Sequence, residues 1–221
     1  MGFDFKYSVM WESVPMLLVG MKLTILITIC GLVAGFVLGA LTGLLKISRK
    51  LLFRKLAGIY IESIRGTPIM VQVMFIYFGL PMALGMRIHP MVAGIVAIAV
   101  NSGAYIAEIV RGAFQSIDPG QTEAGRSIGL THFQTMYYII WPQALKRMIP
   151  PLGNQFIISL KDTSLLVVVG VGELTRTGQE IIAGNFRAFE VWLTVALMYL
   201  VMTLSLSRLL NYFEKKMDIN K

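Results

Sequence analysis

Residues 23–45 read LTILITICGLVAGFVLGALTGLL and carry no charged side chain. An α-helix needs about 20 apolar residues to cross the hydrocarbon core of a bilayer, so this stretch is long enough. The whole chain is 56% hydrophobic and 14% charged, with a mean hydropathy of +0.70, whereas about 25% of the residues in soluble domains are charged. Because lipid offers backbone groups no partners, only helices and closed barrels span a membrane, and the two-residue alternation of barrel strands is missing. The sequence therefore predicts an all-α integral membrane protein.

Four more apolar segments follow, and basic residues indicate which side of the membrane each connection faces. We expect one domain, residues 1–221, with five transmembrane helices at residues 16–45, 57–80, 91–110, 149–169 and 189–210. The stretch from Lys46 to Lys55 holds five basic residues and no acidic one. The positive-inside rule places it in the cytoplasm, which puts the N-terminus outside, and the basic tail puts the C-terminus inside. Residues 170–187 then form an outer loop.

Charge and composition argue against several classes of function. The formal net charge is +8, but the orientation in the membrane accounts for the basic residues, so we expect no nucleic-acid partner. The single cysteine, Cys30, and the two histidines, His89 and His132, are far apart in the sequence, and they predict no metal site. The phosphate-binding pattern GxxxxGKS/T is missing, as is any set of a nucleophile and a base. We expect no catalytic residue.

Glycines recur at every fourth position of the first span, at Gly31, Gly35, Gly39 and Gly43. On a helix they form one bare stripe that lets another helix approach closely. The partner is either a helix of the same chain or a second subunit, and the sequence leaves both open. The second to fifth spans are expected to form one bundle, with the first span on its outside or against a partner.

A polar stretch, residues 118–142, separates the third and fourth spans and reads DPGQTEAGRSIGLTHFQTMYYIIWP. Asp118 suits the N-cap of a helix, Pro119 suits its first position, and Gln121 lies three residues beyond the cap. Gly129 suits the left-handed residue that ends such a helix. We predict a capped helix-turn-helix that projects from the bilayer into the cytoplasm.

The spacing of certain positions in this stretch resembles the EAA loop of permease subunits in binding-protein-dependent ABC importers. These positions are Glu123, Ala124, Gly125, Gly129, Ile139 and Pro142. Gly125 and Trp141 stand where the family usually has Ala and Leu, and both keep the small or apolar character. The resemblance implies that the loop docks on an ATP-hydrolysing subunit and couples it to transport.

Four further stretches resemble the polar amino-acid branch of this family, and within it the glutamine permeases: residues 62–81, 101–113, 150–165 and 173–192. The resemblance implies a type I ABC importer permease fold in the bacterial inner membrane. It also implies two copies of an ABC ATP-binding subunit, a second permease chain (a copy or a close relative) and an extracytoplasmic solute-binding protein. ATP and Mg are then used by the ATP-binding subunit, and this chain binds no cofactor.

Polar and ionisable groups within membrane spans are costly and are candidates for function. For an amino-acid substrate, Asp162 offers an acceptor for the ammonium group, whereas Asn101, Ser102 and Thr163 offer donors for the carboxylate. Tyr105 lies one turn beyond Asn101 and completes the predicted set. The resemblance places the counterparts of Asn101, Ser102 and Asp162 near the inner cavity.

Structural roles compete with these assignments. Lys161 and Asp162 could form an ion pair that only fixes the bundle, and Asn101 and Ser102 could bond one helix to another. Two i, i+3 pairs near the cytoplasmic face are interpreted as structural: Glu62 with Arg65, and Glu108 with Arg111.

The sequence thus predicts a permease subunit that forms the translocation path for a polar amino acid, glutamine, and is coupled to ATPase subunits. The alternative is a self-sufficient secondary transporter or channel for small polar solutes. A Lys-Asp pair within a span and a glycine-rich helix would suit that alternative. It does not explain the EAA spacing, and the sequence has no inverted repeat of the kind that many secondary transporters show.

Overall fold

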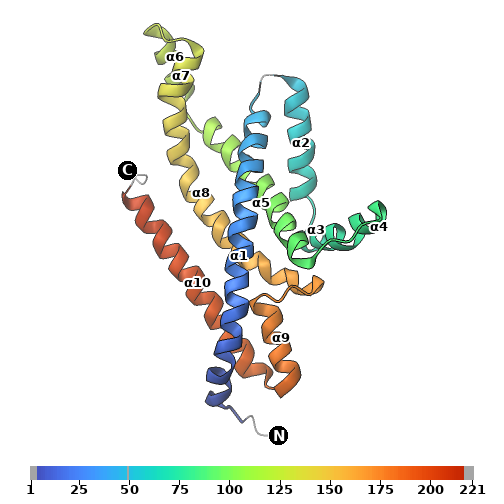
Figure 1. Ribbon diagram of the computed structural model, residues 1–221. Coiled ribbons are helices and arrows are strands. Elements are labelled where there is room, and N and C mark those ends of the chain that lie inside the picture. The colour runs from blue at the N-terminus through green and yellow to red at the C-terminus, as the bar shows by residue number, and fades with distance from the viewer. Residues whose placement is uncertain (1–3, 49, 217–221) are drawn as a thin grey trace.

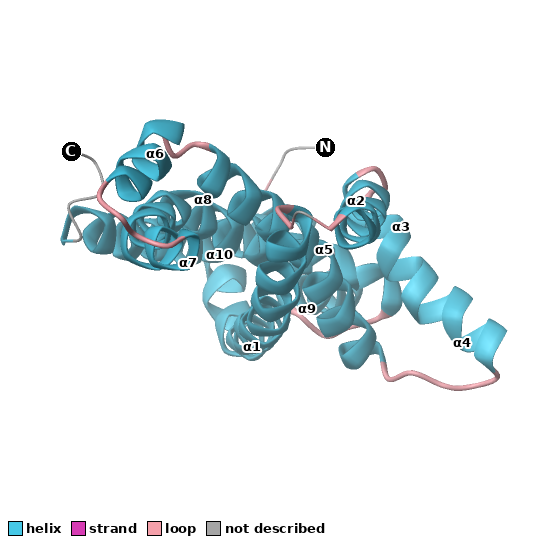
Figure 2. Ribbon diagram, turned by 90° about the horizontal axis from the view of Figure 1, so that it is seen from above, coloured by secondary structure: helices cyan, strands magenta, loops and turns pink. Residues whose placement is uncertain are grey.

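The computed structural model describes residues 4–48 and 50–216, and these residues form helices and short connections without any strand (Figures 1 and 2). In chain order the helices are α1 (Tyr7–Lys46), α2 (Leu51–Arg65), α3 (Ile69–Met74), the π-helix η1 (Phe75–Gly79), α4 (Leu80–Leu84), α5 (Pro90–Gln115), α6 (Pro119–Ser127), α7 (His132–Thr135), the π-helix η2 (Met136–Ile140), α8 (Trp141–Asp162), the 3-10 helix η3 (Thr163–Val169), α9 (Leu174–Asn185) and α10 (Ala188–Lys216). The all-α prediction is confirmed.

Long apolar helices supply the membrane spans. Within the described residues, four helical stretches are long and apolar enough to cross a bilayer: α1, α5, α10 and the run from α7 to η3. A bent pair, α2 followed by α3 to α4, makes a fifth where it is counted as one span. In Figure 1, α6 and α7 lie at one end of the molecule, beyond the α1–α2 connection, whereas α9 and the start of α1 lie at the opposite end.

The glycine stripe of α1 packs against α5. A Cβ atom added at Gly31 would lie 2.6 Å from Ile98 Cγ2, and one added at Gly39 would lie 2.6 Å from the carbonyl oxygen of Gly103. Gly35 meets Ser102 in the same way. The two backbones therefore approach as closely as small-residue interfaces in membranes allow. The partner of the glycine stripe is therefore a helix of the same chain, α5, and not a second subunit. Helix α1 also contacts α9 and α10.

Enlarging this stripe should destabilise the fold. In Gly39→Leu, the new side chain meets a backbone carbonyl that cannot rotate away, so we expect the free energy of unfolding to fall by about 1–3 kcal/mol, as overpacking does elsewhere. Thermal unfolding of the detergent-solubilised protein measures the effect. Val33→Leu is the matched control, because Val33 lies on the same helix and is 63% exposed. Equal stability of both variants would contradict the close packing of α1 on α5.

The second span is not one continuous helix. The prediction for residues 57–80 is corrected here, because α2 ends at Arg65 and the chain turns by 102° into α3. Pro68 lacks an N–H and disfavours helical geometry in the residue before it. Gln72, which is 7% exposed, fixes the corner: its side-chain amide donates to the carbonyl oxygens of Ile64 (2.7 Å) and Thr67 (3.0 Å).

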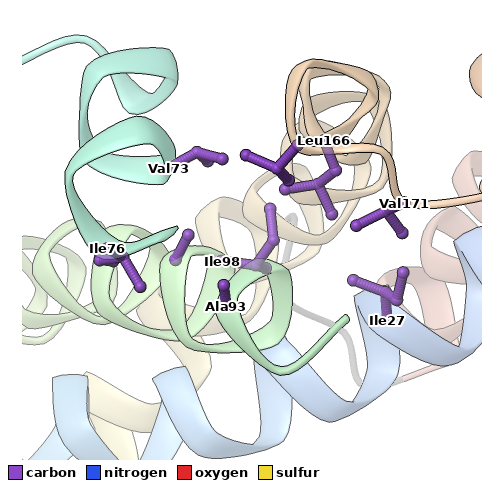
Figure 3. Close-up of a cluster of buried hydrophobic side chains, with 9 residues drawn as sticks. Ile27, Val73, Ile76, Ala93, Ile98, Leu166 and Val171 are labelled. Carbon is purple, nitrogen blue, oxygen red and sulfur yellow. The ribbon is translucent and has the colours of Figure 1, made fainter. Parts of the chain in front are cut away.

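A buried apolar cluster holds this corner against the rest of the molecule (Figure 3). Val73 and Ile76 come from the bent segment, Ile98 from α5, and Leu166 from η3, and their side chains gather in one place. Ile27 of α1 joins the same cluster. Between membrane helices close van der Waals packing, and not burial from water, stabilises such contacts, and here it joins the bent segment to α1, α5 and η3.

A helix lies within the segment expected to be an outer loop. This helix, α9, is capped by Glu173, whose carboxylate accepts hydrogen bonds from the backbone N–H groups of Thr175 (2.9 Å) and Arg176 (2.8 Å) and from the hydroxyl of Tyr199 (3.0 Å). Glu173 is fully buried. Burial raises the pKa of this carboxyl above its ordinary value, and the hydrogen bonds act in the opposite direction.

Candidate functional site

The predicted helix-turn-helix is formed by α6 and α7 and is closed at each end by local capping. Asp118 accepts a hydrogen bond from the N–H of Gly120 (2.7 Å) and caps α6, as predicted. Gly129 adopts the left-handed conformation, with φ +87°. The N–H of Leu130 reaches the carbonyl of Gly125 (3.1 Å), and that of Gly129 reaches Arg126 (3.1 Å). This pattern is a Schellman motif, which fixes how the chain leaves α6.

The role suggested by the position of Gln121 is corrected. Its side-chain oxygen accepts a hydrogen bond from Gln143 in α8 (3.1 Å), so it ties α6 to the next long helix and does not complete a capping box with Asp118. The capping box of this region occurs one helix later, where Thr131 and Gln134 bond each other's backbone N–H groups at the start of α7.

Gly125 is the contact point between the two arms of the hairpin. A Cβ atom there would lie 2.7 Å from Thr135 Cγ2 and 3.0 Å from Ile139 Cδ1. In this chain the lack of a side chain at Gly125 therefore lets Thr135 and Ile139 lie directly against α6. The hairpin formed by residues 118–142 is called the coupling hairpin below.

The outer surface of the coupling hairpin is open. Glu123 and Ala124 are exposed, and Ile128 and Phe133 are each 76% exposed. The ring of Phe133 stacks on that of Tyr137, with centroids 6.3 Å apart. Large exposed apolar side chains grouped at a projecting tip are typical of an interaction surface.

A polar cleft of about 510 Å³ lies where the α2–α3 corner meets α5 and α8. Three residues predicted for substrate contact line it: Asn101, Tyr105 and Asp162. Residues that the prediction missed line it as well, among them Arg65, at the end of α2, and Gln155 of α8. Residues separated by almost a hundred positions in the sequence are thus brought to one cavity.

The other two predicted contact residues face away from the cleft. Ser102 is 1% exposed, its hydroxyl donates to the carbonyl of Ala99 (3.4 Å), and it lies against Gly35 of α1. Thr163 is fully buried, and its hydroxyl donates to the carbonyl of Leu160 (2.7 Å). Both hydroxyls satisfy backbone groups within their own helical segment, so neither offers a donor to the cleft.

Asn101 has a structural contact in addition to its place in the cleft. Its side-chain N–H donates to the side-chain oxygen of Gln72 (3.2 Å), and Gln72 holds the α2–α3 corner. The suggestion that Asn101 bonds one helix to another is therefore confirmed for this residue. The same amide lies at the cleft and fixes the shape of its wall.

The charges around the cleft differ from the predicted pairs. Glu108 and Arg111 do form the expected ion pair (2.7 Å), but Arg65 also reaches Glu108 (3.3 Å) and lies over the ring of Tyr105 (5.3 Å to the centroid). Glu62 pairs with Lys46 of α1 (3.5 Å), so the predicted pair of Glu62 with Arg65 is wrong.

Asp162 is the isolated charge of this region. Across residues 4–48 and 50–216, its carboxylate has no ion pair within 4.0 Å, so the suggested pair with Lys161 is not formed. The cleft therefore has a carboxylate on one wall and a guanidinium on another. One sequence signal could have revealed Arg65: it stands three residues before Pro68, where a helix is expected to end and free a long side chain.

Known proteins resemble this chain in sequence and in fold. The family described as binding-protein-dependent transport system inner membrane component matches residues 31–219. The chain belongs to this family. It is 54% identical to the glutamine transport system permease protein GlnP of Escherichia coli (strain K12) over 217 residues, which cover 98% of this chain and 99% of that protein. The arginine transport system permease protein ArtQ of Bacillus subtilis (strain 168) is 33% identical over 220 residues, with all of both chains covered.

The fold has a close match among solved structures. The crystal structure of an amino acid ABC transporter with histidines contains a chain that superposes with a TM-score of 0.92 at 41% identity, covering 97% of this permease and 100% of that chain. The predicted type I importer fold and the inner-membrane location are confirmed. This permease is a subunit of an amino-acid ABC importer, which decides against a self-sufficient transporter or channel.

Proposed function

We propose that this permease carries a polar amino acid, glutamine, and that the cleft between the α2–α3 corner, α5 and α8 is where the amino acid is held during transport. The observation that carries the proposal is that Asp162 and Arg65 line the same cleft, together with Asn101, Tyr105 and Gln155. The 54% identity to a glutamine permease supports the choice of glutamine.

The cleft suits the two charges of a free amino acid. The Asp162 carboxylate accepts hydrogen bonds from the ammonium group, and the Arg65 guanidinium donates to the carboxylate, which is the stronger, charge-assisted kind of hydrogen bond. Arg65 shares Glu108 with Arg111, so two positive charges face one negative charge. An incoming carboxylate neutralises the remaining charge. The amides of Asn101 and Gln155 then suit a neutral amide side chain such as that of glutamine.

The energy for transport comes from other subunits in this proposal. Two ABC ATP-binding subunits, which use ATP and Mg, dock on the coupling hairpins of this permease and of a second permease chain. An extracytoplasmic solute-binding protein delivers the amino acid at the opposite face. The N-terminus lies outside and the C-terminus in the cytoplasm, which places the coupling hairpin on the ATPase side. In this proposal the permease itself supplies no catalytic group and binds no cofactor.

Reconstitution tests the proposal. The permease is purified with its ATP-binding subunit, placed in proteoliposomes, and supplied with ATP and the glutamine-loaded binding protein from its host. We expect uptake of labelled glutamine that requires both ATP and the binding protein. An excess of unlabelled glutamine delivered on the binding protein should compete, and glutamate or arginine should compete less. Uptake that persists without ATP or without the binding protein would overturn the proposal.

Charge reversal at the tip of the coupling hairpin should uncouple the importer. Glu123 is exposed in the middle of α6, so Glu123→Lys should fold normally and weaken docking on the ATPase. We expect uptake to fall about tenfold, the size of effect that a reversed interface charge can have, while ATP hydrolysis continues. Glu214→Lys, at the cytoplasmic end of α10, is the control. Unchanged uptake in Glu123→Lys would contradict the docking role.

A further inference from the structure

One residue at the opposite end of the molecule from the coupling hairpin adopts a backbone conformation that its side chain disfavours. Phe186, in the α9–α10 connection, has φ +57° and ψ +22°, the left-handed region. Among the described residues it is the only one other than glycine with positive φ. Bulky residues rarely adopt this geometry because their Cβ atom crowds the backbone, and glycine is the usual choice where a helix ends in this way.

Packing inside the chain does not explain the phenylalanine. Its side chain is 86% exposed, so the ring gains little from burial that would offset the backbone conformation. Better residues for the position stand directly before it, since Gly184 and Asn185 both accept the left-handed region readily. The backbone conformation at Phe186 is therefore unfavourable for an aromatic residue, and packing within the chain does not offset it.

The surroundings of Phe186 hold it in place. Its N–H bonds to the carbonyl of Ile182 (2.8 Å). The next residue, Arg187, donates to the backbone carbonyl of Asp4 (2.8 Å) and pairs with Glu190 at the start of α10 (3.5 Å). These contacts tie the α9–α10 connection to the segment before α1, so the ring is presented by a fixed turn.

A hollow of about 320 Å³ lies beside this turn, between the first turns of α1 and the end of α9. Asn185, Glu12 and Glu180 are among the residues that line it. Glu180 pairs with Arg176 (3.0 Å), whereas Glu12 makes no ion pair with any residue in the described ranges. The turn thus offers a protruding apolar ring next to a mainly apolar hollow that Glu12 lines.

We propose that Phe186 and the adjoining hollow form the surface on which the extracytoplasmic solute-binding protein docks. The inference rests on the proposed orientation, in which the end that contains α9 and the start of α1 (Figure 1) faces outward. The matching family is binding-protein-dependent, and in the proposed function the binding protein meets the outer face. The partner surface that fits is an apolar socket for the ring beside a basic side chain that enters the hollow towards Glu12. Aromatic anchors of this kind dominate many interfaces.

Stimulation of ATP hydrolysis tests the proposal. The complete importer is placed in nanodiscs, and its ATPase rate is measured against the concentration of the glutamine-loaded binding protein from its host. In Phe186→Gly we expect the half-saturating concentration to rise about tenfold, as loss of an aromatic anchor does, with the basal rate unchanged. Glycine suits the left-handed turn, so the thermal midpoint should stay the same or rise. Glu12→Lys should raise the half-saturating concentration as well.

Trp11→Ala is the matched control, because Trp11 is an aromatic residue on the outer part of α1 that is also highly exposed, at 77%. We expect no change in its half-saturating concentration. An equal rise in Trp11→Ala would mean that aromatic anchoring in the lipid interface explains the effect, and it would overturn the proposal. An unchanged value in Phe186→Gly would overturn it while leaving the transport function intact. A wild-type importer that no binding protein stimulates would overturn both.

Discussion

Gly125→Val should abolish transport without unfolding the membrane part of the permease. The Cβ atom alone would lie 2.7 Å from Thr135 and 3.0 Å from Ile139, and valine adds two methyl groups beyond it. The two arms of the coupling hairpin must then separate, at a cost of about 1–3 kcal/mol for an overpacked contact. The exposed surface that we propose to dock on the ATPase then loses its shape. We expect uptake in proteoliposomes to fall to background and the ATP-binding subunit to be lost during co-purification.

Gly112→Val is the control for this prediction. Gly112 lies near the C-terminal end of α5, shortly before α6, and a Cβ atom there meets nothing within 4 Å. Its uptake should stay close to that of the unmodified protein. If Gly125→Val retains the ATP-binding subunit and full uptake, the hairpin is not the docking element. If the variant is lost from the membrane altogether, Gly125 serves folding and the coupling role needs other support.

Asp162→Asn should remove uptake while leaving the assembled importer intact. The carboxylate is an acceptor that carries a full negative charge, and the replacement is nearly the same size but neutral and partly a donor. Loss of one partner of a buried, hydrogen-bonded charge pair costs about 2–5 kcal/mol. We therefore expect glutamine uptake to fall by a factor of about 30 to several thousand, since each 1.4 kcal/mol is a factor of ten.

Two further measurements show whether Asp162 contacts the amino acid or only supports the fold. Co-purification of the ATP-binding subunit and the basal ATPase rate should both be unchanged in Asp162→Asn. The neighbouring change Lys161→Gln should leave uptake near normal, because Lys161 is exposed and outside the cleft lining. Failure of Asp162→Asn to assemble would show a structural role. Normal uptake would place the ammonium contact elsewhere.

The coupling hairpin was largely predictable because its signals are local. Asp118 as a cap and Gly129 as a left-handed end depend on a few neighbouring residues, and local hydrogen-bonding chemistry determines both. The glycine stripe predicted a close helix contact for the same reason, although the identity of the partner helix required the fold. The predicted role of Gln121 in capping α6 was wrong because its side chain accepts a hydrogen bond from Gln143, more than twenty residues away.

The cleft was only partly predictable because it is formed by elements that are distant in the sequence. Residues 57–80 are apolar enough to suggest a straight span, and hydropathy does not register the 102° corner that Pro68 and Gln72 produce. Arg65 is brought to the cleft by that corner. The prediction for Ser102 was wrong because successive side chains on a helix point about 100° apart. Asn101 lines the cleft, and Ser102 next to it points towards α1.

The connection between α5 and α6 has a mechanical consequence. Only Ser116, Ile117 and Asp118 lie between the two helices, and Arg147 of α8 donates to the carbonyl of Ser116, so the joint has little slack. The bare stripe of α1 keeps that helix in backbone contact with α5 along several turns. Helices α1 and α5 therefore form one rigid body, to which the coupling hairpin is attached at one end. A tilt of the coupling hairpin should therefore move Asn101 and Tyr105 together with α1 and α5 as a rigid body. The contacts between these two helices should not change.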